Sequence, residues 1–421
     1  MIVPAIDRSI GIEVYSTDIQ GIAGSIKRST DHFIVEELLD DTSFDLAANA
    51  DEEHEYPLYL LQKVGIDSSR AIKEAEVTAG LKFKFVGLKD AKALTKQYAS
   101  CVRICRDARK HINTKHCTLD LLGYTRRPIT KRNLLGNSFS ITIMGFLCDG
   151  VEQRISKLEE ILRRNRIANF YGYQRFGSSR AVTHLVGREI VNRNFNRAVE
   201  LYLCFPNIYD TKEIMEMREA CKDSINFQKV LKIMPAQMDL ERILLWELAR
   251  SKDPVRAIRR LPITIRRLLV QAYQSYLFNR SLSIAIKEGY DIGTPMTRDV
   301  CFLFTNGSFI GIKRFDEDNP AVIQLPAIPL PGYAFKDDNR FSSLVKKVME
   351  DEHLEKNDFY VKELQEVSVE GGFRHTSLLG DRFSHSLSES LKLEFILYKG
   401  CYATVLLREL MKPEDPIASG F

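Results

Sequence analysis

The chain has 421 residues, of which 44% are hydrophobic and 28% are charged, and its formal net charge is +4. This length suits two domains, and the composition provides a large apolar core while excluding collagen-like, coiled-coil and disordered proteins. The longest apolar runs are far shorter than the roughly 18 residues that span a bilayer, and the first residues lack the pattern of a signal peptide. We therefore expect a cytoplasmic protein that makes no contact with a membrane.

The first part of the chain, 1–177, mixes strand and helix patterns. Strands are expected in four stretches that are rich in β-branched and aromatic residues: His32–Glu36, Phe83–Val86, Tyr98–Ile104 and Phe139–Met144. Helices are expected at Ser68–Ala79, where Asp67 is a suitable N-cap, and at Val151–Arg166. This mixture indicates an α+β fold.

After residue 177 the pattern becomes mainly helical. The expected helices are Arg193–Tyr202, Thr211–Cys221, Arg242–Ser251 and Ile263–Glu288. Ala321–Gly332 contains three prolines and is expected to be a loop or an edge. Strand patterns return at Lys392–Leu397 and Cys401–Leu407. A helical middle between two α+β ends indicates an inserted domain.

One group of side chains has the chemistry of metal ligands: Cys101, Cys105, His111, His116 and Cys117. Their spacing matches no standard metal site, and the chain contains no C-x-x-C pair. We interpret the cysteines as structural thiols and expect no metal.

Basic residues gather in three places along the chain. These are Arg126-Arg127 with Lys131-Arg132, Arg163-Arg164 with Arg166, and Arg259-Arg260 with Arg266-Arg267. Any one of them is compatible with a solvated surface. Together they favour a surface that contacts nucleic-acid phosphates, because each neutralised phosphate releases a counterion.

The sequence lacks the common patterns of nucleotide, dinucleotide and zinc-hydrolase sites, namely Walker A, G-x-G-x-x-G and H-E-x-x-H. Its most informative segment, Phe83–Ser100, runs from a short apolar strand into Gly87, after which Lys89 and Asp90 follow in a turn. Turns after strands often present reactive side chains. Asp90 is therefore either a reactive carboxylate or an ordinary turn or N-cap residue.

Two further segments combine aromatic and polar residues. Asn169–Gly177 (NFYGYQRFG) holds four aromatic residues and two glycines. Such a loop can stack on a nucleobase while its amide and guanidinium groups read base edges or phosphates. Lys399–Leu410 (KGCYATVLLREL) reads as a buried strand that leads towards a helix. On the residues alone, both segments are also compatible with purely structural roles.

Taken together, these three segments resemble the TruD family of pseudouridine synthases. GLKDAKALTKQ is similar to the family signature G-x-K-D-x-x-A-x-T-x-Q, and NFYGYQRFG to N-[FY]-[FY]-G-x-Q-R-F-G. KGCYATVLLREL is similar to the C-terminal signature G-[SC]-[FY]-A-T-x-x-x-R-E-[LI]. The segments occur in the family's order and in a style that resembles archaeal members. The chain departs from the common pattern at Asp31-His32-Phe33 and at Tyr171, which keeps an aromatic face.

The resemblance implies a pseudouridine synthase catalytic domain, with a mixed, mainly antiparallel sheet flanked by helices, built from 1–177 and 366–421. It implies that 178–365 is the inserted, largely helical α+β TRUD domain, with the RNA in the cleft between the two. The implied activity is that of an isomerase that converts a uridine of tRNA, expected at position 13, to pseudouridine. This reaction requires no cofactor.

The resemblance also assigns roles to single residues. Asp90 is expected to be the nucleophile. Lys27 is expected to be the cation that keeps Asp90 ionised, with Arg408 as a second candidate. The target base must be flipped out of the RNA, and Tyr171 is expected to stack on it. Asn169 would orient the nucleophile or contact the base.

Tyr402 is expected to pack on the other side of the same pocket. Two other functions stay open at this point. One is an RNA-binding or chaperone protein that lacks catalysis, and the other is a metal-dependent RNA hydrolase that uses the Cys/His group.

Overall fold

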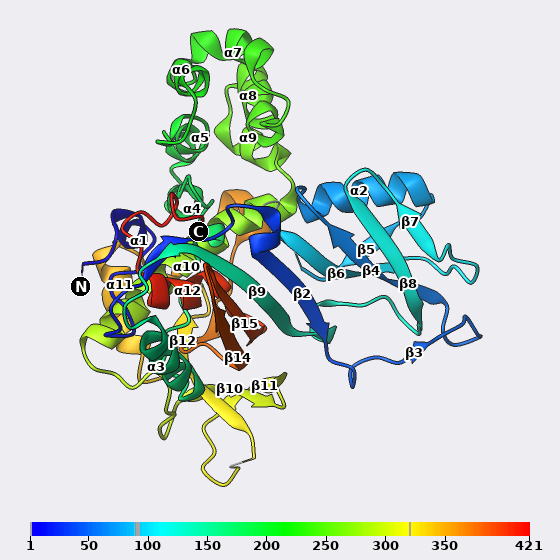
Figure 1. Cartoon of the computed structure of the whole chain (residues 1–421). Coiled ribbons are helices and arrows are strands. Elements are labelled where there is room, and N and C mark those ends of the chain that lie inside the picture. Colours follow the sequence, from blue (N-terminus) through cyan, green and yellow to red (C-terminus); the bar gives the residue numbers. More distant parts are fainter. Residues whose placement is uncertain (1, 88, 90–92, 320) are drawn as a thin grey trace.

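The structure is a computed structural model that describes residues 2–87, 89, 93–319 and 321–421 (Figure 1). It combines a large mixed sheet and a smaller antiparallel sheet with helices that lie against the sheets or project from them (Figure 1). The predicted α+β class is confirmed.

The large sheet contains strands from both ends of the chain. Along its main path lie β14 (Gly380–Leu387), β15 (Leu391–Tyr398), β9 (Leu134–Phe146), β2 (Phe33–Leu39), β6 (Leu94–Cys101), β4 (Tyr56–Lys63), β8 (Cys117–Thr125) and β3 (Leu46–Ala47). Three short strands pair at its sides: β1 (Ala23–Ser25) with β9, β5 (Phe83–Phe85) with β6, and β7 (His111–Asn113) with β8. β2 and β6 run parallel and the other described pairs run antiparallel, as predicted.

Strand β9 joins the N-terminal and C-terminal parts of the chain. It pairs with β2 on one side and β15 on the other, so Phe139 lies opposite both Val35 and Phe395. In β2 the buried and partly exposed residues alternate, which is the pattern of a strand with one face on the core. Figure 1 shows the blue β2 and the dark red β15 on either side of β9.

Two helices next to this sheet were expected from their sequence. α2 (Ser68–Ala79) has the predicted bounds, and the Asp67 carboxylate caps it by accepting from the backbone N–H groups of Ser69 and Arg70, each at 3.0 Å. α3 begins as predicted but ends earlier, and spans Val151–Arg163.

The prediction of a strand at Cys401–Leu407 is wrong. This stretch belongs to helix α12 (Ala403–Met411), which packs against α3. All nine of its residues are buried. A helix that is buried on every side has no polar face, so its apolar run cannot be distinguished from a buried strand by periodicity.

The middle of the chain is helical, as expected. It contains α4 (Thr183–Val191), α5 (Phe195–Cys204), α6 (Lys212–Ala220), α7 (Phe227–Ile233), α8 (Asp239–Ser251), α9 (Pro254–Arg260) and α10 (Ile263–Lys287). Figure 1 shows α5 to α9 projecting from the rest of the molecule. α10 packs tightly against α4. The approach is so close that a Cβ atom at Gly187 of α4 would lie only 2.0 Å from the carbonyl oxygen of Leu269 of α10. Among the described residues, no helix is long and apolar enough to cross a membrane.

The smaller sheet has the order β11 (Ser308–Arg314), β10 (Val300–Thr305), β12 (Ile323–Leu330) and β13 (Gly372–His375), and α11 (Ser342–Asp351) packs against β12. β12 carries Pro326 and Pro329, two of the three prolines for which a loop or an edge was predicted, and Pro331 follows it. Its first half pairs only with β10 and its second half only with β13. Each half is therefore an edge, where a proline without an N–H group is tolerated, and the prediction of an edge is confirmed.

Candidate active site

A cavity of about 330 Å³ lies between the start of α12, β2 and β9. Its walls are formed by Phe33, Val35, Lys89, Ala93, Asn137, Phe139, Gln174, Cys401, Tyr402, Ala403 and Thr404. The lining includes residues from all three segments on which the family resemblance rests, although these segments are far apart in the sequence. The others come from β2 and β9.

Asp90, the predicted nucleophile, lies outside the described residues. The nearest described residues on either side of it, Lys89 and Ala93, both line the cavity. Buried hydrogen bonds hold the start of this segment. Gln97 Nε2 donates to the Gly87 carbonyl at 2.7 Å, and the Lys89 N–H donates to Ser68 Oγ at 3.0 Å. The chain is thus fixed immediately before Asp90, as a preorganised site requires.

Lys89 brings a positive charge to the cavity wall. Its ammonium lies 3.3 Å from the buried carboxylate of Glu37 and also donates to Asn137 Oδ1. Burial lowers the pKa of Lys89, and the charge of Glu37 opposes this effect. Glu37 is held in turn by the backbone N–H of Tyr98, at 2.9 Å. The ion pair therefore belongs to the sheet and orients the Lys89 side chain beside the cavity.

Aromatic side chains make up much of the remaining wall. Phe33 and Phe139 are neighbours on β2 and β9, with ring centres 6.4 Å apart, and Phe139 also stacks on Phe395 at 5.4 Å. Lys27, the predicted cation, places its ammonium 4.7 Å from the centre of the Phe33 ring. Tyr402 closes the cavity from the side of α12. Such flat apolar walls suit a planar base.

Tyr171 lies behind Tyr402 and is not among the described residues that line the cavity. Its ring centre is 6.2 Å from that of Tyr402 and 5.5 Å from that of Phe278. The guanidinium carbon of Arg374 lies 3.9 Å from the centre of the Tyr171 ring and 5.6 Å from that of Tyr402. The two tyrosines thus share one buried cation.

Asn169 is completely buried and fixes Arg374. Its carbonyl oxygen and its Oδ1 accept hydrogen bonds from Arg374 at 3.1 and 2.9 Å. Its Nδ2 lies 3.2 Å from Nε2 of His375, whose Nδ1 donates to the Ser377 carbonyl at 2.7 Å. Burial and the charge of Arg374 lower the pKa of His375 to about 3, so His375 is neutral and its Nε2 accepts from Asn169.

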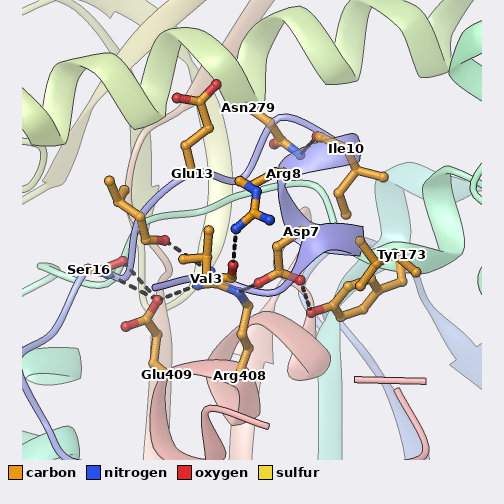
Figure 2. Close-up of polar contacts among 12 residues, drawn as sticks. Val3, Asp7, Arg8, Ile10, Glu13, Ser16, Tyr173, Asn279, Arg408 and Glu409 are labelled. Carbon is orange, nitrogen blue, oxygen red and sulfur yellow. Dashed lines mark hydrogen bonds and ion pairs between the residues drawn. The ribbon is translucent and has the colours of Figure 1, made fainter. Parts of the chain in front are cut away.

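Arg408, the second candidate cation, is engaged in a different part of the core (Figure 2). Its guanidinium binds Asp7 at 2.5 Å and Glu409 at 3.0 Å. The Tyr173 hydroxyl donates to the other oxygen of Asp7 at 2.6 Å, and Glu409 accepts from the backbone of Ser16 at 3.1 Å. This network joins the N-terminal segment to α12, and we assign Arg408 a structural role.

Two histidines were considered as metal ligands, and each contacts a carboxylate instead. His111 contacts Asp120 at 2.7 Å and His116 contacts Glu74 at 2.8 Å. Burial raises the pKa of Cys101 to about 12. Within the described ranges, no three His, Cys, Asp or Glu side chains are arranged to hold a metal ion.

The family model for tRNA pseudouridine synthase D (TruD) matches residues 9–410. The chain belongs to the TruD family. It is 30% identical to a protein of Archaeoglobus fulgidus named probable tRNA pseudouridine synthase D, over 97% of this chain and 99% of that protein. A Methanosarcina barkeri protein of the same name is 32% identical over 99% of both chains. The crystal structure assigned to TruD of Methanosarcina mazei covers 99% of this chain and all of that one, with a TM-score of 0.77 and 29% identity.

Several residues in or next to this cavity of a TruD-family chain were given no role from the sequence. Lys89 and Gln174 stand inside the recognised segments, so attention to their polar side chains could have found them. Asn137 and Phe139 line the cavity and belong to an ordinary strand pattern. Arg374 lies in no recognised segment and stands next to the cavity, against the rings of Tyr171 and Tyr402. Only the pairing of β9 with β2 and of β13 with β12 brings these three residues to the site.

Proposed function

We propose that this chain isomerises a uridine of tRNA to pseudouridine, with Asp90 as the nucleophile and without a cofactor. One observation carries the proposal. The residues on both sides of Asp90 line an aromatic cavity that residues of the other two family segments, Gln174 and Tyr402, also line. The family match supports the same chemistry on a tRNA substrate.

The reaction needs few groups, because it only rearranges bonds. The bond between N1 and C1′ of the uridine breaks, the uracil turns, and C5 bonds to C1′. C5 loses a proton and N1 gains one, so the atoms balance without redox or ATP. The Asp90 carboxylate would add either to C1′ of the sugar or to the base and would leave again at the end.

Asp90 must be ionised when the RNA excludes water from the cavity, and a nearby cation would keep its pKa low. We propose Lys27 for this role, because its ammonium lies against Phe33, which lines the cavity. Lys89 is another cation at the cavity wall, where it pairs with Glu37.

The target base must leave the RNA stack, at a cost of a few kcal/mol. Tyr402 and Phe139 line the cavity and would offset part of that cost by packing on the uracil, at roughly 1–3 kcal/mol per stacked base. The stacking role of Tyr171 stays a prediction. Its place behind Tyr402 supports an indirect contribution, and the buried Asn169 would act by holding Arg374.

The finer assignments rest on the family resemblance. The expected target is the uridine at position 13 of tRNA. We also propose that 1–177 and 366–421 form the catalytic domain and that 178–365 is inserted. β13, from the second catalytic segment, pairs with β12 of the insertion, so the two domains would share a sheet.

The test is incubation with an unmodified tRNA transcript, followed by carbodiimide treatment and primer extension. We expect one modified uridine with the wild-type protein and none with Asp90→Ala, while tRNA affinity stays within severalfold, because one carboxylate adds little to a phosphate-dominated interface. The exposed Asp107 provides a matched control, and Asp107→Ala should keep full activity. A clean transcript with the wild-type protein would instead favour an RNA-binding protein without catalysis.

A further inference from the structure

A second cavity lies beyond the carboxyl end of β2, outside the site described above. Its volume is about 770 Å³. It is lined by Ser43, Phe44, Asp45, Thr125, Arg126, Arg127, Pro128, Ile129, Thr130, Lys131, Arg132 and Asn133. We call the loop Arg126–Asn133 the basic loop. It contains one of the three basic clusters that the sequence shows.

The cations of the basic loop are poorly neutralised. Arg126 pairs with Asp45 at 3.3 Å and with Glu53 at 2.8 Å. For Arg127, Lys131 and Arg132, by contrast, no carboxylate partner occurs among the described residues. All three side chains are exposed, so an anion from solution can reach them.

A further cation joins the group from the C-terminal part of the chain. The Lys399 ammonium donates to the Lys131 carbonyl at 2.7 Å. Burial, followed by the charges of Lys131 and Arg132, lowers the pKa of Lys399. A partly buried cation beside two like charges is electrostatically unfavourable, and a bound anion would relieve the repulsion.

In the other two basic clusters of the sequence, most cations have a carboxylate partner. Arg164 pairs with Glu160 at 2.7 Å, and Arg163 pairs with Glu159. Arg260 pairs with Glu247 at 2.8 Å. Arg259 and Arg267 are exposed like the cations of the basic loop, but each donates to a backbone carbonyl, of Glu363 and Glu366 respectively. The basic loop differs from both clusters in lining a cavity with three cations that have no carboxylate partner among the described residues.

The basic loop is also held rigidly. Thr130 and Asn133 form a capping box around the short turn between them, and Asn133 Nδ2 donates to the Ser43 carbonyl at 3.1 Å. Ile129 is buried, and its N–H donates to Ser100 Oγ at 3.0 Å. The exposed cations thus stand on an ordered base, which lowers the entropy that binding would cost.

Two chain segments connect this group to the catalytic cavity. Arg132 precedes Asn137 of the cavity wall by five residues, and Lys399 precedes Cys401 by two. Five residues of extended chain span at most ~18 Å, so the two sites lie within a few nucleotides of one RNA strand.

We propose that Arg127, Lys131, Arg132 and Lys399 bind backbone phosphates of the tRNA next to the uridine that enters the catalytic cavity. The proposal rests on the proposed function for the identity of the RNA. These contacts would fix the position of the strand and carry no sequence information.

The test compares tRNA binding by the wild-type protein with that by the triple variant Arg127→Ala/Lys131→Ala/Arg132→Ala, as a function of salt. We expect the Kd to rise roughly 10- to 100-fold, and the slope of log Kd against log salt to fall by about 2, because three phosphate contacts are lost. The control Arg163→Ala/Arg164→Ala/Lys346→Ala removes the same charge from residues that have carboxylate partners, and should change neither quantity by more than about twofold.

Equal affinities and equal salt slopes for the wild-type protein and the triple variant would overturn the proposal. The proposal would also be overturned if the basic loop bound only free phosphate. In that case the triple variant would lose the binding of inorganic phosphate but would keep its affinity for tRNA. Binding is measured without turnover, so a failure of the pseudouridine assay leaves this result readable. Variants whose thermal unfolding midpoint equals that of the wild-type protein would be shown to be folded.

Discussion

The guanidinium carbon of the buried Arg374 lies 3.9 Å from the centre of the Tyr171 ring and 5.6 Å from that of Tyr402, which lines the cavity. Arg374 uses its hydrogen bonds on backbone and amide oxygens of Asn169 and Phe170. The orientation of Tyr171 therefore depends on Arg374, which Asn169 holds by hydrogen bonds. The Tyr171 ring in turn packs against the ring of Tyr402.

Two replacements of Arg374 should separate the contribution of its hydrogen bonds to Asn169 from that of its contact with the tyrosine rings. Arg374→Lys keeps the charge but loses the paired hydrogen bonds, which leaves Asn169 Oδ1 without a partner and costs about 1–3 kcal/mol of stability. Arg374→Met also loses the interaction with the rings, at roughly 0.5–2 kcal/mol more. Urea unfolding measures both. Equal stability of all three proteins would show that the contact contributes nothing.

Tyr402 should affect turnover through its ring. Tyr402→Leu removes an aromatic wall of the cavity, and the loss of a stack worth roughly 1–3 kcal/mol lowers the single-turnover rate about 5- to 150-fold. Tyr402→Phe keeps the ring and should stay near the wild-type rate. If the two variants lose activity equally, the hydroxyl rather than the ring matters.

Tyr171→Leu is expected to reduce turnover more than stability, because Tyr171 is only partly buried. Its effect should be smaller than that of Tyr402→Leu, since Tyr171 lies against Tyr402 and is not among the described residues that line the cavity. The rates of the two variants, measured at saturating tRNA, decide this order. An unfolded Tyr171→Leu protein would instead make Tyr171 a core residue.

The fold was predicted best where an element depends only on the residues of its own segment. β2 follows from its β-branched and aromatic residues, and α2 follows from its helical pattern with the Asp67 cap; these are local properties. α12 was not recognised as a helix, because the packing that buries all of its faces is a tertiary property. The two halves of β12 pair with different strands, and this pairing likewise could not be predicted because β13 comes from a distant segment.

The site was predicted only in part, for a similar reason. The recognised segments contain Lys89, Gln174 and Tyr402, which the fold brings together in the wall of one cavity. Phe139 and Arg374 carry no local signal and reach the site through strand pairing and through Asn169. Arg408 has the charge of a catalytic cation, but the network around Asp7 engages it elsewhere.

The Arg408–Asp7 pair should be essential for stability (Figure 2). Both side chains are buried, so Asp7→Asn leaves the guanidinium with less compensating charge, and removing one partner of a buried pair costs about 3–5 kcal/mol. The double variant Asp7→Asn/Arg408→Met should lose less than the two single losses added together. Urea unfolding of the four proteins tests this, and strictly additive losses would contradict a direct interaction.

Two buried histidines should make the protein less stable in mild acid. Burial lowers the pKa of His184 to about 4, and burial together with the charge of Arg374 lowers that of His375 to about 3. In the unfolded chain both titrate near 6.5, so below that pH the unfolded state binds more protons and stability falls as the pH drops.

Between pH 7.5 and 5 each of these histidines should cost about 2 kcal/mol, because a shift of one pKa unit corresponds to 1.36 kcal/mol. His184→Gln should reduce the slope of stability against pH, whereas His385→Gln, at an exposed position, should not. Asp51 and Asp45 raise the pKa of His54, which acts in the opposite direction and cancels when the variants are compared. Urea unfolding at several pH values measures the slopes, and an unchanged slope for His184→Gln would mean that this histidine titrates in the folded protein as it does in the unfolded chain.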